Sequence, residues 1–171
     1  GRAQGRRDCG CRPLLTGWFL MTARAIKFID THSHLQVERL DGHRAQWLAQ
    51  AREAGLENIL LCAGAPEDWE RTLSTAHEWG LGAMLGIHPL WLDSTTPAEL
   101  VGLRELAESL LDDPHFIGLG EVGLDGFEPG LDQHKAEQVF LEELKISRDL
   151  DLPLSIHVRR TASKTLGLLR R

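Results

Sequence analysis

Two histidines, one residue apart, end the first apolar run of the chain. His32 and His34 follow residues 26–29, a run typical of a short buried strand. Successive side chains of a strand point to opposite faces, so residues i and i+2 share a face and both imidazoles can point into one space. Two neutral imidazoles there suit a borderline divalent cation such as zinc or manganese. Alone, the pair is a weak signal, because one solvated and one hydrogen-bonded histidine give the same pattern.

Three later apolar runs also end in ionisable side chains. His88 ends one of them, Glu121 and Asp125 end another, and His157 and Arg159 end the third. A packed core has no need of this pattern, whereas α/β enzymes gather their site residues at the carboxyl ends of strands. The sequence therefore indicates one functional site built from several strands.

Composition and charge are those of an ordinary soluble enzyme. With 171 residues, 42% of them hydrophobic, the chain can bury a core in one domain. The net charge of −6 argues against a broadly basic surface that coats nucleic acid. It does not exclude a nucleic-acid substrate, because bound metal ions can supply positive charge. Three cysteines indicate no disulfide framework, and Cys62 is interpreted as a core residue of a reduced, cytoplasmic protein.

The amino-terminal segment differs from the rest of the chain. Arginines precede a short apolar patch at residues 14–21, which polar and glycine residues interrupt, so the segment makes a poor signal peptide. We interpret Met21 as the natural start, residues 1–20 as an extension expected to be disordered, and residues 21–171 as the folded domain. No stretch is long enough to span a membrane.

From residue 26 onward, strand-like runs alternate with helical patterns. The expected strands are 26–30, 58–63, 82–87, 116–120 and 154–158. In the first helical pattern Trp47, Leu48, Ala51 and Ala54 share one face, which predicts that they point inward. The third pattern opens with the capping box Thr96-Pro97-Ala98-Glu99. The tryptophans on these faces are interpreted as packing residues rather than ligand contacts.

Repeated strand–helix units predict a parallel sheet with right-handed crossovers. A (β/α)8 barrel and an open doubly wound sheet both fit. No GxGxxG follows the first strand, and no GxxxxGK[ST] phosphate loop is present. Site residues on the first, third, fourth and fifth strands converge more naturally around a barrel mouth. The expected fold is α/β, a partial (β/α)8 TIM barrel with about five of eight strand–helix units.

Together, the four blocks FIDTHSHL, GIHP, GLGEVGLD and LSIHVR resemble the TatD family of metal-dependent deoxyribonucleases and related hydrolases. The likeness runs in order from about residue 26 to the last residue. It implies a (β/α)8 barrel that holds two divalent metal ions (magnesium, manganese or zinc) and cleaves DNA or other phosphodiesters.

The resemblance also implies a role for individual residues. His32 and His34 match the pair that holds one metal. Glu121 matches the catalytic carboxylate that bridges both metals, and His157 matches a ligand of the second. Two metals that share a carboxylate can activate a water molecule and hold both the attacking and the leaving oxygen of a phosphodiester.

Two further residues match positions that line the substrate cleft. Arg159 offers a planar fork for phosphate oxygens, and His88 can donate a hydrogen bond or a proton. Asp125 lies in the same segment as Glu121 and is interpreted as structural.

The length departs from the family pattern. Residues 26–171 hold five units, whereas eight would need about 230 residues. A second histidine and an aspartate expected for the second metal would lie on later strands. We therefore expect a fragment with exposed sheet edges and a half-filled second metal site.

Two other functions stay open. A small-molecule amidohydrolase or lactonase on a similar barrel also begins with HxH, but it commonly bridges its metals with a carboxylated lysine. Glu121, with no lysine in residues 118–130, counts against that class. The other alternative is an inactive, truncated remnant that binds metal without catalysis.

Overall fold

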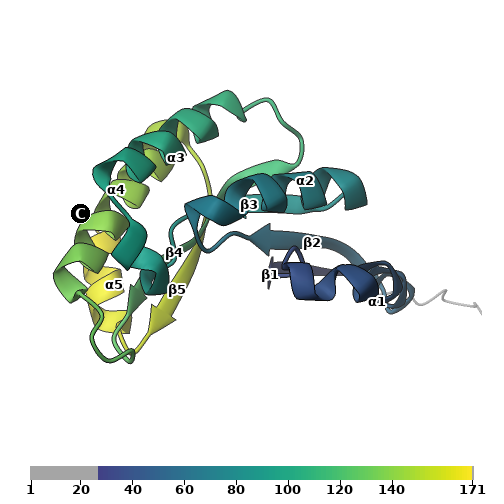
Figure 1. The fold of residues 1–171 in the computed structure, drawn as a ribbon, viewed down its shortest axis with the longest axis horizontal. Helices are drawn as coiled ribbons and strands as arrows, with labels where there is room; N and C mark the ends of the chain where they lie inside the picture. Colours follow the sequence, from purple (N-terminus) through teal and green to yellow (C-terminus); the bar gives the residue numbers. More distant parts are fainter. Residues whose placement is uncertain (1–26, 171) are drawn as a thin grey trace, which may run out of the picture.

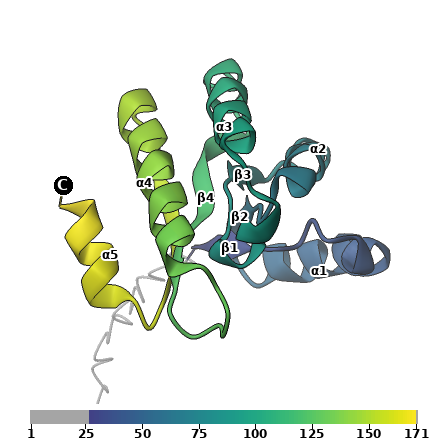
Figure 2. The same cartoon turned by 60° about the vertical axis from the view of Figure 1, so that its left-hand side comes forward.

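The fold is a curved parallel sheet with helices along its outer side (Figures 1 and 2). A computed structural model describes residues 27–170, apart from the side chains of residues 93 and 94. The proposed boundary between an extension and a domain at residues 20 and 21 lies outside the described residues. The strands are β1 (Phe28–Ser33), β2 (Leu56–Cys62), β3 (Gly82–Leu85), β4 (Phe116–Asp125) and β5 (Leu154–Arg159).

A helix follows each strand. These are α1 (Asp41–Glu53), α2 (Trp69–Trp79), α3 (Pro97–Ser109), α4 (Gln133–Leu150) and α5 (Ala162–Leu169). Short 3-10 helices precede three of them, at Glu38–Leu40, Pro66–Asp68 and Pro89–Ser94. The capping box that opens α3 is present as predicted, with the Thr96 N–H donating to Glu99 Oε2 at 2.7 Å. No helix of the described part is both long and apolar enough to cross a membrane.

Strand order confirms the predicted fold class. The five strands are parallel and lie in the order β1-β2-β3-β4-β5, which is the order of a barrel wall. In a doubly wound sheet the order of the strands along the sheet would instead reverse at a switch point, while the strands stay parallel. The sequential order brings the carboxyl ends of all five strands to one rim, where the site lies.

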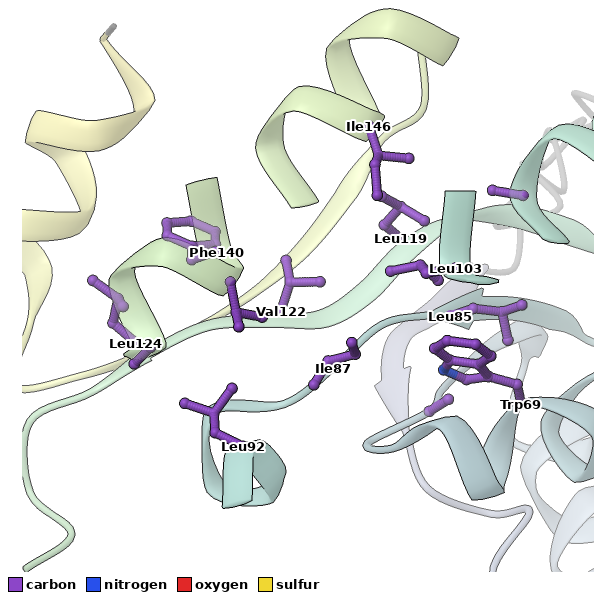
Figure 3. Packing of buried hydrophobic residues seen from close by; sticks show 14 of the residues in the cluster. Trp69, Leu85, Ile87, Leu92, Leu103, Leu119, Val122, Leu124, Phe140 and Ile146 are labelled. Carbon is purple, nitrogen blue, oxygen red and sulfur yellow. The ribbon is translucent and has the colours of Figure 1, made fainter. Parts of the chain in front are cut away.

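Two apolar clusters fix the strands to the helices. The larger one joins β3, β4 and β5 to α3 and α4, with Leu103, Leu119 and Phe140 fully buried (Figure 3). The smaller one joins β2, β3 and the segment after β1 to α1 and α2 around Leu61. Phe28 and Ile29 on β1 and Val158 on β5 remain exposed, as expected for the two outermost strands of the described sheet.

The structure corrects several predicted strand bounds, and three of them concern the site. β1 ends at Ser33 and not at residue 30, so His32 lies within the strand. β3 stops at Leu85 and not at Ile87, because the Ile87 N–H donates to the side chain of Glu143 instead of to a neighbouring strand. β4 continues past Gly120 to Asp125, so the site carboxylates lie within the strand.

The predicted inward face of α1 is partly wrong. Trp47 is 41% exposed and stacks on His43, and Ala54 is exposed as well. The buried face of α1 is narrower and consists of Leu48 and Arg44, whose guanidinium donates to the Leu35 carbonyl. Because α1 is the first α-helix of the described residues, a helix flanks it on one side only, and it has fewer neighbours against which to bury a wide stripe.

Glu143 of α4 is a fully buried carboxyl group. Its Oε1 accepts the Ile87 N–H at 2.8 Å, while its Oε2 has no hydrogen-bond partner among the described residues. Burial raises the pKa of Glu143 well above its ordinary value, and the hydrogen bond from Ile87 offsets this only partly. Glu143 is therefore a neutral acid that anchors the segment leading to His88.

Replacing Glu143 with glutamine should change how stability depends on pH. Above about pH 4.5 the unfolded chain ionises this carboxyl while the folded chain keeps it protonated, so wild-type stability falls as the pH rises. Glu143→Gln removes this penalty. The unfolding free energy of the variant minus that of the wild type should therefore increase with pH, by up to about 1.4 kcal/mol per pH unit. Urea unfolding at pH 5, 6 and 7 measures the difference.

The matched control is Glu142→Gln, which alters an exposed carboxyl on the same helix. Its difference from the wild type should not change with pH. If the Glu143→Gln difference were equally constant, the neutral-acid assignment would be wrong.

Candidate metal centre

One buried carboxylate lies at the centre of the strand ends. Glu121 of β4 is 7% exposed, and both of its oxygens face imidazole nitrogens. Oε2 lies 3.0 Å from His32 Nε2 and 3.4 Å from His34 Nε2. Oε1 lies 2.8 Å from His157 Nδ1 and 3.4 Å from His88 Nε2. The structure thus brings together residues from β1, β4, β5 and the segment after β3.

Glycines on β4 make this convergence possible. A Cβ on Gly120 would lie 2.7 Å from the Cβ of Ser155, and one on Gly123 would lie 2.3 Å from the His157 carbonyl oxygen. Gly123 also has φ +136°, a conformation that other residues rarely adopt. β4 and β5 can therefore approach closely enough to set His157 against Glu121.

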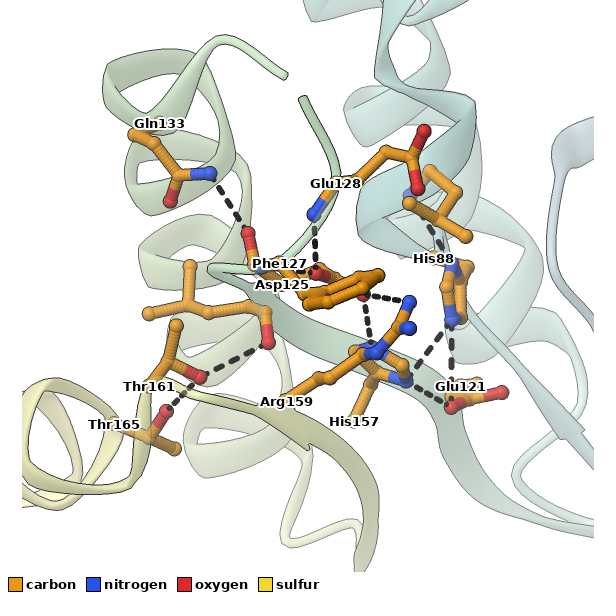
Figure 4. A network of polar contacts seen from close by, with 12 residues as sticks. His88, Glu121, Asp125, Phe127, Glu128, Gln133, His157, Arg159, Thr161 and Thr165 are labelled. Atoms are coloured by element: carbon orange, nitrogen blue, oxygen red, sulfur yellow. Dashed lines mark hydrogen bonds and ion pairs between the residues drawn. The ribbon is translucent and has the colours of Figure 1, made fainter. Parts of the chain in front are cut away.

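The outer nitrogens of two histidines are fixed by acceptors. His34 Nδ1 lies 2.9 Å from the Cys62 carbonyl oxygen. His157 Nε2 lies 3.0 Å from Asp125 Oδ2, as Figure 4 shows. Both contacts require an N–H, so the nitrogen that faces Glu121 carries the lone pair in the neutral ring. Histidine metal ligands are held in the same way, with the outer N–H on a carbonyl or a carboxylate.

His88 is held in the opposite tautomer. Its Nδ1 accepts the Leu90 N–H at 3.0 Å, so the proton of the neutral ring is on Nε2. That Nε2 lies 3.1 Å from His157 Nδ1 and faces the Glu121 carboxylate. His88 therefore presents a hydrogen-bond donor to the centre, which agrees better with the substrate contact expected from the sequence than with a metal ligand.

The charges around Glu121 favour its ionised form. Burial opposes ionisation, but the close imidazoles of His34, His88 and His157 outweigh it and hold the pKa of Glu121 well below its ordinary value. The pKa of His34 is raised, chiefly by its contact with Glu121. A carboxylate and an imidazole lone pair are both acceptors, so each contact between them needs a proton or a cation.

Two groups of side chains have the donor chemistry of a metal site. His32, His34 and Glu121 form one, and His88, Glu121 and His157 form the other, with ligand atoms within 4.8 Å of one another in each. Imidazole and carboxylate donors suit zinc or manganese. Cys62 lies next to the first group, but burial raises the pKa of its thiol to about 11, so it stays protonated and belongs to the core.

Asp125 links His157 to Arg159. It is fully buried, its Oδ1 accepts the Phe127 and Glu128 N–H groups at 2.7 and 3.0 Å, and its Oδ2 lies 3.6 Å from Arg159 Nη1. Burial raises its pKa, but these hydrogen bonds outweigh that effect and lower it to about 2. Asp125 is thus an ionised positioning residue, which refines the structural interpretation made from the sequence.

Sequence reasoning missed one direct contact of the cluster. Ser155 Oγ lies 2.8 Å from His32 Nδ1. Ser155 lies two residues before His157 on β5, so the period of a strand places both on the same face and would have identified it.

Comparison with known proteins gives a consistent result. Residues 29–171 match the family described as TatD related DNase. The "uncharacterized metal-dependent hydrolase YjjV" of Escherichia coli (strain K12) is 33% identical over 147 residues, which are 85% of this chain and 56% of that protein. The "3'-5' ssDNA/RNA exonuclease TatD" of Cronobacter turicensis is 27% identical over 141 residues, 82% of this chain and 52% of that protein.

A solved structure shows the same fold. The crystal structure of the TatD homolog YjjV from Escherichia coli matches with a TM-score of 0.79 at 32% identity, covering 84% of this chain and 55% of that chain. The chain therefore spans about half the length of the curated relatives it matches.

Removing the charge of Glu121 should weaken metal binding. Glu121→Gln keeps the size of the side chain but leaves a neutral amide between the two groups of histidines, so affinity for Mn²⁺ or Zn²⁺ should fall at least about tenfold. Isothermal titration of the purified chain measures this. Glu128→Gln, an exposed position in the nearby loop, is the control and should bind like the wild type. Equal affinities for wild type and Glu121→Gln would contradict the assignment.

Asp125→Asn should weaken metal binding through His157. The introduced amide can turn its NH2 group towards His157 Nε2, which favours the tautomer of His157 with the proton on Nδ1. The affinity for the metal ion should therefore fall by about 10- to 100-fold. The same titration tests this, with circular dichroism to verify the fold. A variant that is folded and binds metal normally would show that Asp125 does not orient His157.

Proposed function

Because the chain belongs to the TatD-related DNase family, we propose that the protein is a metal-dependent hydrolase that cleaves phosphodiester bonds in DNA with two divalent metal ions. The observation that carries the proposal is the position of Glu121, whose two oxygens are shared between two groups of imidazole donors. A buried carboxylate with a different group at each oxygen is the arrangement that bridges a pair of cations.

In this proposal the residues divide into ligands and substrate contacts. His32 and His34 would hold one ion and His157 would hold the other, and Glu121 would be a ligand shared by both. When bound, two such ions lower the pKa of a water molecule and polarise the phosphoryl group. The buried Glu121 keeps its negative charge at neutral pH, so it can hold both cations throughout the reaction.

Two residues of the chain act on the substrate. The Nε2–H of His88 points into the cluster and can donate to a phosphate oxygen, or supply a proton to the departing oxygen. Arg159 presents its guanidinium beside the cluster and can bind non-bridging oxygens of the phosphate. Asp125 fixes the guanidinium on one side, which lowers the cost of orienting it when substrate binds.

The names of the relatives support nucleic acid as the substrate. One is named a 3'-5' ssDNA/RNA exonuclease and another, from Homo sapiens, a deoxyribonuclease. A small-molecule amidohydrolase or lactonase is not favoured, since Glu121 lies between the two groups of histidines and residues 118–130 contain no lysine that could be carboxylated to bridge two metals.

The test is cleavage of end-labelled single-stranded DNA by the metal-loaded protein, in a chain completed with the later strands that the sequence analysis expects. We expect cleavage that requires Mg²⁺, Mn²⁺ or Zn²⁺ and is abolished by a chelator. Glu121→Ala should lower turnover at least about a hundredfold, because the two cations lose the anion between them. Arg159→Ala should raise KM more than it lowers kcat, because a phosphate contact is lost while the metal centre is kept.

Arg148→Ala, an exposed arginine of α4, is the control for Arg159→Ala. Near-normal turnover of Glu121→Ala would exclude the two-metal mechanism. Metal binding without any cleavage of DNA would favour the alternative of a non-catalytic metal-binding protein.

A further inference from the structure

An aromatic ring with two arginines lies beside the metal centre, on the loops that follow β4 and β5. The guanidinium carbon of Arg159 lies 3.8 Å from the ring centroid of Phe127, and that of Arg160 lies 4.4 Å from the same centroid. Figure 4 shows the Arg159 guanidinium against this ring, next to His157. Phe127 is 42% exposed, so the group lies at the surface.

The two arginines differ in how their charge is balanced. Arg159 lies 3.6 Å from the buried carboxylate of Asp125. Arg160 has no ion-pair partner within the described residues. Two positive charges on one ring repel each other, and the Asp125 carboxylate faces Arg159. The positive charge of Arg160 is therefore not balanced by an ion pair with any described residue, although the net charge of the chain is −6.

The backbone holds this arrangement in place. Arg160 has φ 57°, in the left-handed region where residues other than glycine are strained. The Gly126 N–H donates to the Arg159 carbonyl at 2.7 Å, and the Thr161 hydroxyl donates to the Leu124 carbonyl at 3.0 Å. These bonds join the two loops on both sides of Arg160. Neither the core nor the metal ligands need an arginine in this conformation, so its side chain is free for a ligand.

We infer that Arg160, oriented by Phe127, binds the phosphate next to the one that is cleaved, so that the ring and its two arginines hold the backbone of a single nucleic-acid strand. The inference rests on the proposed function, in which Arg159 binds the scissile phosphate. Consecutive phosphates of one strand are close enough for two guanidiniums on one ring to bind both. Such a contact depends on charge and not on base sequence.

The choice of variant separates binding from folding. Arg160→Gly removes the guanidinium at a position whose φ favours glycine, so the variant should fold at least as well as the wild type. Arg160→Lys keeps the charge but loses the planar group that stacks on Phe127. Arg148→Ala, at the far end of α4, removes an exposed arginine away from the site.

The experiment measures binding of a fluorescein-labelled eight-nucleotide oligo(dT) by anisotropy, with a chelator present so that no cleavage occurs. Arg160→Gly should bind about tenfold more weakly at low salt, and the slope of log affinity against log salt should fall by about 0.7, the value for one lost contact to a single strand. Arg160→Lys should restore part of the affinity, and Arg148→Ala should match the wild type. Competition by bis(4-nitrophenyl) phosphate, which has one phosphate, should be unchanged by Arg160→Gly.

Two results would overturn the inference while leaving the proposed function intact. One is wild-type affinity and salt slope in Arg160→Gly, and the other is an equal loss of binding for the one-phosphate probe, which would place Arg160 at the scissile phosphate. A wild-type protein that neither binds the oligonucleotide nor cleaves DNA would instead remove the proposed function, and the inference with it.

Discussion

The ionised carboxylate of Glu121, buried among imidazole rings, is the interaction on which the rest of the site depends. A carboxylate out of water costs several kcal/mol unless positive charge or hydrogen bonds replace its solvent. His34 and His157 already give their outer N–H groups to Cys62 and Asp125, so they turn lone pairs towards Glu121. Protons or metal ions must then lie between them. The cluster is therefore organised around cations and not as a self-sufficient hydrogen-bond network.

Much of this organisation could be predicted from the sequence, because it follows from strand periodicity and from the position of ionisable residues after apolar runs. His32 and His34 share a face, as the spacing i and i+2 requires, and the sequential strand order brings Glu121 and His157 to the same rim. The extent of β4 was not predictable by the same reasoning. Glycine lowers strand propensity, so the pattern predicts that the strand ends at Gly120. In the structure these glycines lie within β4, because a side chain at Gly120 or Gly123 would clash with β5.

Other parts of the site leave no pattern in the sequence. The Cys62 carbonyl that fixes His34 is a backbone group, and any residue at that position would supply one. The tautomer of His88 depends on the Leu90 N–H and so on the turn that follows β3. Trp47 fits an amphipathic stripe, but periodicity does not show that α1 is the first α-helix of the described fold and buries only part of that stripe against β2. These features depend on tertiary contacts, which local patterns do not encode.

The two halves of the centre rest on different cores, and this affects how firmly each is held. His157 and His88 lie over the larger apolar cluster and are the less exposed pair, with side-chain exposures of 19% and 11%. His32 lies in the outermost strand β1 and His34 lies directly after it, next to Leu35 of the smaller cluster, with side-chain exposures of 37% and 48%. Glu121 contacts both pairs, so the rigid half can orient the carboxylate towards the more exposed one. The HxH pair, the strongest signal in the sequence, is thus held in part by a carboxylate on β4, a strand with which β1 does not pair.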